Sequence, residues 1–124
     1  MNNRTAGILS DILSAGANIQ QFVAEVSFED YIASTLLRSA VERQFEIIGE
    51  ALARLSRHNP DVFAQIPNAR RIIDFRNVLA HGYDVIDHEI VWQAIHEHLP
   101  QLLSVIRSML DDFERGRVSG SQET

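Results

Sequence analysis

Four polar side chains stand together at the end of an otherwise apolar segment, in the stretch RNVLAHGY (residues 76–83). They are Arg76, Asn77, His81 and Tyr83. Histidine titrates near neutral pH and can transfer protons. Arginine stays charged and can bind phosphate or stabilise negative charge as it develops. Such a set suits RNA cleavage without a metal or cofactor: one group deprotonates the ribose 2′-hydroxyl, which attacks the adjacent phosphate, and the arginine stabilises the anionic transition state.

The spacing of these residues on a helix limits how they can meet. Asn77 and His81 are four residues apart and therefore share one helix face. Arg76 and His81 are five apart, a rotation of about 140°, so they do not stack directly. We expect Gly82 to end the helix just after His81 and Tyr83 to lie in the following loop. The four groups are then expected to converge at the helix end, where a symmetric dimer would supply two histidines, one as base and one as acid.

Two other interpretations of these residues remain open. A histidine at a helix C-terminus often only interacts favourably with the helix dipole, and an Arg–Asn pair there can cap exposed carbonyls. The protein would then be a plain helical interaction module. Alternatively, it is a non-catalytic subunit that presents nucleotide or substrate to a separate nucleotidyltransferase, and Arg76 and His81 bind phosphate without cleaving it.

The elements that must position this set are predicted to be helices, because apolar residues recur every three or four positions along almost the whole chain. The first stripe consists of Ile8, Ile12, Ala15, Ile19, Phe22 and Val26. Ser27 is expected to cap a second helix that runs from about Phe28 to about Leu55. Asn59 and Pro60 predict a short helical turn, after which a new helix from near Asn68 carries the polar set.

A last helix follows, capped by Asp87, with a kink or break expected at Pro100. Several of its apolar residues lie outside the main stripe and predict a dimer interface: Ile90, Trp92, Leu103, Val105 and Leu110. No segment has a clear strand pattern. The predicted fold is all-α, an antiparallel bundle of four to five helices that forms a homodimer. Residues 1–115 would form the bundle and residues 116–124 a disordered tail.

Composition sets further bounds on function. The chain has 124 residues, the size of one domain, and no cysteine, which excludes disulfides and thiolate metal sites. No apolar run approaches the roughly 18 residues of a membrane span, so we expect a soluble, cytoplasmic protein. The net charge of −6 argues against general affinity for nucleic acid. However, residues 54–76 hold five arginines against two acids, a net of +3, just ahead of and including Arg76.

All eleven basic residues are arginine, which suits bidentate phosphate binding but is equally expected from a GC-rich genome. Negative charge follows the polar set. Residues 84–114 hold seven acids against one arginine, a net of −6.

Other residues invite smaller hypotheses. His88, His96 and His98 suggest a metal, but their spacings do not bring two ligands together, so we expect structural or solvated roles and no metal site. Trp92 is expected to pack in the core or an interface. Glu50 is either a buried acid that orients Arg76 or a surface acid.

Three segments resemble a known family. Arg76, His81 and Tyr83 match the R-x4-H-x-Y signature of the HEPN superfamily, in particular its HepT toxin branch, and Asn77 matches the polar residue that typically follows the arginine. FEIIGEAL (residues 45–52) resembles the IGEA segment of the same branch, and IVWQAIHEHLPQL (residues 90–102) resembles its final helix. The likeness covers roughly residues 5–113, in the same order.

The resemblance implies a dimeric all-helical fold with the arginine and histidine at the dimer interface. It also implies a metal-independent ribonuclease in which Arg76 and His81 carry catalysis. A minimal nucleotidyltransferase is the implied antitoxin partner, which in this family can silence the toxin by attaching AMP to the motif tyrosine, here Tyr83.

Overall fold

A computed structural model of the chain describes residues 1–81 and 86–123; the side chains of residues 80, 81 and 117–123 lie outside this description. Along the described residues the order is α1 (Asn3–Phe22), α2 (Phe28–Ala33), α3 (Thr35–His58), α4 (Pro60–Ala64), α5 (Ala69–His81), α6 (His88–Gln93), the π-helical turn η1 (Ala94–His98) and α7 (Leu99–Glu123). These residues contain no β-strand. The all-α prediction is confirmed.

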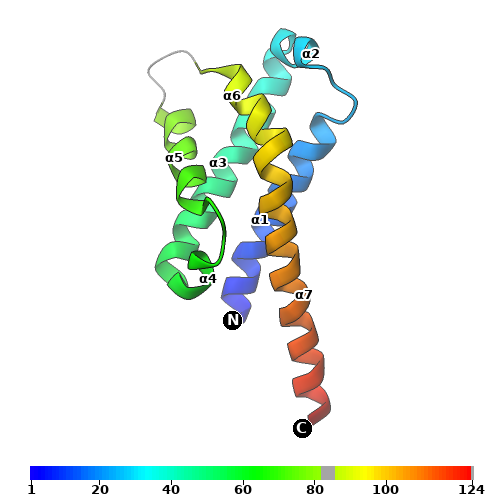
Figure 1. Cartoon of the computed structure of the whole chain (residues 1–124), viewed down its shortest axis with the longest axis vertical. Helices are drawn as coiled ribbons and strands as arrows, with labels where there is room; N and C mark the ends of the chain where they lie inside the picture. The colour runs from blue at the N-terminus through cyan, green and yellow to red at the C-terminus, as the bar shows by residue number, and fades with distance from the viewer. Residues whose placement is uncertain (82–85, 124) are drawn as a thin grey trace.

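The long helices run in alternating directions (Figure 1). α1 leads away from the N-terminus, α3 returns beside it, α5 runs back along α3, and α6, η1 and α7 descend as one continuous rod. α3 is the central helix, since it packs against both α1 and α5, and α7 packs on α1. This is the antiparallel helical bundle that the sequence predicted.

The core consists of the apolar stripes of α1, α3 and α7. Fully buried side chains include Ile12 and Ile19 of α1, Leu52 and Leu55 of α3, and Ile106 of α7. Each such side chain stabilises the fold by about 1.5–3 kcal/mol when it leaves water. Among the helices described, none is both long and apolar enough to span a membrane.

One predicted element was wrong, because the long second helix is two helices. Ser34 interrupts it with an extended backbone (φ −107°, ψ 102°), and its side chain accepts a hydrogen bond from the Leu37 amide as the cap of α3. Serine followed by Thr35 favours such a break, since serine hydroxyls compete for backbone groups and a β-branched residue restricts the helix. Ser27 does cap α2, as expected.

The sequence predicted a kink or break at Pro100, whereas the structure has a π-helical turn just before it and the helix continues through the proline. Proline cannot donate the backbone hydrogen bond of its turn and crowds the carbonyl four residues earlier, here that of His96. The π-helical turn η1 lies just before Pro100 and includes His96. Asp87 caps α6 as predicted, accepting from the amides of Glu89 and Ile90. α7 continues to Glu123, into the segment expected to be disordered, and the boundary at residue 115 stays a prediction.

A small polar cluster lies among α2, α3 and α6. Tyr31 of α2 is fully buried, and its ring packs 5.2 Å from that of Trp92. Its hydroxyl has no hydrogen-bond partner among the described residues. Burial, and secondarily the charge of Glu42, raise the pKa of this phenol above its usual range. Burial also raises the pKa of the Glu42 carboxyl.

Replacing Tyr31 by Phe should therefore stabilise the fold or leave it unchanged. The ring and its packing stay, whereas the hydroxyl that was desolvated without a partner is removed, a relief of about 1 kcal/mol. Urea unfolding of both proteins measures the effect. A loss of stability greater than about 1 kcal/mol would reveal a hydrogen bond of the Tyr31 hydroxyl that this structure lacks.

Candidate functional site

The helix that carries the polar set begins at a residue with a left-handed backbone. Asn68 has φ 61°, a conformation that asparagine adopts more readily than most residues. Its carbonyl accepts the amide of Ile72 at 3.2 Å, which starts the hydrogen-bond ladder of α5. α5 then runs along α3 and ends, within the described residues, at His81.

Arg76 lies where α5 comes closest to α3, directly over Gly49. A Cβ atom added to Gly49 would overlap the Cβ of Arg76 and would lie 2.6 Å from its Cγ and 3.5 Å from the carbonyl oxygen of Ile72. Only glycine leaves room for this approach. The residue that makes this close helix contact with Gly49 is the candidate catalytic arginine.

The charge of Arg76 has no partner among the residues that the structure describes. The side chain is half-buried, and its Nε is a buried donor without a hydrogen-bond acceptor among the described residues. Arg76 forms no ion pair with a carboxylate of the described chain either. Buried polar groups are normally satisfied, so an unpaired guanidinium suggests that an anionic ligand supplies the missing acceptor.

The other members of the polar set are placed less completely. Asn77 is exposed on α5. His81 is the last residue of the helix, and its side chain is outside the described atoms. Tyr83 and the expected helix stop at Gly82 also fall outside the described residues. Because α5 stays helical to His81, positions 76 and 81 are separated by about 140° around it, and the expected convergence of the four groups stays a prediction.

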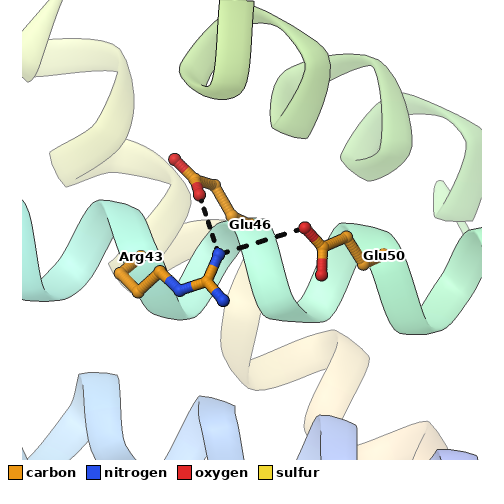
Figure 2. Close-up of polar contacts among 3 residues, drawn as sticks. All are labelled: Arg43, Glu46 and Glu50. Carbon is orange, nitrogen blue, oxygen red and sulfur yellow. Dashed lines mark hydrogen bonds and ion pairs between the residues drawn. The ribbon is translucent and has the colours of Figure 1, made fainter.

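Glu50 proves to be a surface acid and not a buried partner of Arg76. Its side chain is 50% exposed and lies 4.0 Å from Arg43, which also pairs with Glu46 at 3.1 Å. Figure 2 shows the Arg43 guanidinium between the two carboxylates, all three on α3. An exposed network of this kind contributes about 0–1 kcal/mol per pair.

The histidines give no metal site within the described residues, where no group of three potential ligands occurs. The Nδ1 of His96 lies 2.9 Å from the Trp92 carbonyl oxygen, one turn back. Trp92 packs against the rings of Phe28, Tyr31 and His96, so the expected packing role is confirmed.

An apolar pocket of about 160 Å³ adjoins the site. Phe75, the neighbour of Arg76, lines it together with Phe45 and Ile90. Ile90 is 53% exposed, and Val78, one turn beyond Phe75, is 59% exposed. Exposed aliphatic side chains beside a pocket are typical of surfaces that contact another protein. Leu103, which the sequence assigned to a dimer interface, is instead buried in the core.

Gly49→Ala should destabilise the protein, although alanine is the better helix former by about 1 kcal/mol. The added methyl group must push α5 away, at an overpacking cost of about 1–3 kcal/mol. Gly7→Ala in α1 is the matched stability control, because its added Cβ meets nothing within 4 Å. Thermal unfolding should therefore move the two variants in opposite directions, and a stabilised Gly49→Ala protein would show that α5 does not require this close approach.

An antiparallel helical bundle in which an arginine is followed five residues later by a histidine at a helix end has the architecture and motif of the HEPN class. That arginine has no ion-pair partner among the described residues. The model of one family of this class, described as ribonuclease HepT-like, matches residues 12–109, and the chain belongs to this family. The motif residues fall within the matched region.

Individual relatives agree with this assignment. A protein of Thermococcus cleftensis named as a probable ribonuclease HepT is 33% identical over 94 residues, which span 76% of this chain and 84% of the relative. A protein of Methanocaldococcus jannaschii named as a candidate RNase is 30% identical over 94 residues, 76% of this chain and 85% of its own. Another candidate RNase, from Caldanaerobacter subterraneus, is 29% identical over 102 residues, 82% and 90% of the two chains. No solved structure matches the chain.

Proposed function

We propose that the protein is a metal-independent endoribonuclease and the toxin of a toxin–antitoxin pair. The observation that carries this proposal is Arg76: a half-buried guanidinium without an ion-pair partner among the described side chains, held against Gly49 in a HepT-like chain. The names of the relatives support RNA as the substrate.

His81 and Arg76 divide the chemistry between them. An imidazole of His81 takes the proton of a ribose 2′-hydroxyl, and the 2′-oxygen attacks the neighbouring phosphorus. Arg76 stabilises the added negative charge on the phosphoryl oxygens. The bond from phosphorus to the 5′-oxygen breaks, and a second imidazole returns a proton to that oxygen. The products are a 2′,3′-cyclic phosphate and a 5′-hydroxyl. Asn77 is proposed to orient the reacting groups.

The second imidazole comes from a second copy of the chain. Val78 on the motif helix α5 and Ile90 on α6 have exposed aliphatic side chains. A homodimer formed through them would bring the two copies of the helix end together. An interface that is isologous, with the same patch on both copies, would place both histidines at one symmetric site.

The proposed partner is a minimal nucleotidyltransferase that acts as antitoxin. It would transfer AMP from ATP to the phenol oxygen of Tyr83 and release pyrophosphate. The added phosphate introduces negative charge two residues from His81, where it repels an RNA phosphate and competes for Arg76.

A cleavage assay tests the proposal. Purified protein whose intact mass excludes added AMP is incubated with total tRNA and mRNA in excess EDTA, beside His81→Ala. Cleavage that the substitution abolishes supports the ribonuclease. If unmodified protein cuts no RNA, the proposed activity is wrong, and nucleotide binding by calorimetry then tests the alternative of a phosphate-binding subunit.

A further inference from the structure

A basic groove lies between α1 and α3, on residues to which the proposed chemistry assigns no role. It is lined by Arg4, Gly7, Ile8 and Asp11 of α1 and by Arg54, Arg57 and His58 of α3. Three arginines against one aspartate give it a net charge of +2 before any histidine is protonated. In a chain of net charge −6, this is a local reversal of sign.

Two of these arginines are available to a ligand. Arg54 is 3.7 Å from Asp11, and both side chains are more than half exposed, so solvent screens their interaction. Arg4 and Arg57 are exposed and pair with no carboxylate of the described residues. The only acid in the groove is thus already opposite one arginine, which leaves the other two charges uncompensated.

A side-chain hydrogen bond joins the two helices that line the groove. Asn59, which ends α3 and caps α4, donates its side-chain amide to the hydroxyl of the buried Thr5 in the first turn of α1, at 3.4 Å. This hydrogen bond and the packing of α1 on α3 join the two walls of the groove. Gly7 leaves the α1 wall open, because a Cβ there would meet nothing within 4 Å.

The groove and the contact of Arg76 with Gly49 lie on the same helix, α3. Gly49, on which Arg76 rests, is eight residues before Arg57 on α3, an axial distance of about 12 Å. The groove and the Arg76 contact are therefore about two helical turns apart along α3, close enough for one RNA strand to reach both.

We propose that this groove binds the phosphate backbone of the RNA substrate at nucleotides away from the cleaved bond, with Arg4 and Arg57 as the principal phosphate ligands. Guanidinium groups in an open groove suit this chemistry, because contacts to phosphate position a strand without reading its sequence. The RNA identity of the ligand rests on the proposed ribonuclease function.

Binding is measured apart from cleavage, with a fluorescently labelled single-stranded RNA and a His81→Ala background that leaves the RNA intact. Arg4→Gln with Arg57→Gln removes the two free charges. Gly7→Gln fills the groove with an uncharged side chain from a good helix former. Arg43→Gln is the control, since it removes one arginine charge from α3 outside the groove. Melting curves confirm that each variant is folded.

The double arginine variant should bind at least tenfold more weakly, and the slope of log affinity against log salt should shrink by about 1.4, or 0.7 for each lost contact. Gly7→Gln should also weaken binding, whereas Arg43→Gln should not. Unchanged binding in both groove variants, or no RNA binding by the parent protein, overturns the proposal. If the groove variants lose binding but the wild-type protein cleaves nothing, the groove assignment stands and the ribonuclease proposal fails.

Discussion

Arg76→Ala is expected to lower the rate of RNA cleavage by about 10²–10³-fold, the effect typical of removing one preorganised donor to a developing anion. The structure provides the reason that stability should survive this change. Arg76 has no ion-pair partner among the described side chains, so its removal leaves no described carboxylate without its partner. Alanine also keeps the Cβ that packs over Gly49.

Arg76→Lys separates charge from geometry. Lysine keeps the positive charge but lacks the planar fork that binds two phosphoryl oxygens at once, so we expect partial activity between that of the alanine variant and the wild type. Arg43→Ala, which removes an exposed arginine paired with Glu46, is the control and should cleave normally. All are assayed in excess EDTA with equal folded fractions. Full activity in Arg76→Ala would remove this residue from the mechanism.

The sequence predicted the fold well because hydrophobic periodicity and capping residues are local signals. Ser27, Asn59 and Asp87 each cap a helix where expected. The break at Ser34 was missed because the apolar pattern continues across it. The signal at the break is the hydrogen bond that the Ser34 hydroxyl accepts from the Leu37 amide, where one helix ends and the next begins. The competition between a serine hydroxyl and the backbone leaves only a weak signal in the sequence, and the packing of the helices decides its outcome.

The candidate site was predictable as a motif but not as a geometry. Which residue packs on Gly49 depends on how α5 lies along α3, and spacing within one helix carries no information about that register. The distribution of charge along the sequence was misleading for the same reason, because the fold decides which charged residues lie together. The arginine-rich stretch of residues 54–76 looked like one positive region, whereas the fold places Arg54 and Arg57 in a groove with α1 and Arg76 on a different helix. Arg4, distant in sequence, completes the groove.

Val78→Glu is expected to separate the proposed dimer and to abolish cleavage with it. Val78 is 59% exposed, so a glutamate there is solvated in the monomer and costs little stability. In a symmetric interface the same residue approaches its counterpart or a nearby apolar group, and a desolvated, unpaired carboxylate costs several kcal/mol on each side. The mass from light scattering should fall from twice to once the 14.0 kDa of the chain. Leu36→Glu is the matched control, because Leu36 is 83% exposed near the start of α3, and it should stay dimeric.

Mixing subunits then tests why the dimer is needed. If one active site uses a histidine from each copy, a heterodimer of wild-type and His81→Ala chains is inactive. An equal, re-equilibrated mixture should retain about a quarter of the activity of the same total amount of wild type, since only that share of random dimers has both histidines. Chains that act independently would retain half. A wild-type protein of monomeric mass that cleaves RNA, or a mixture that retains half the activity, would place both proton transfers within a single chain and remove the second copy from the mechanism.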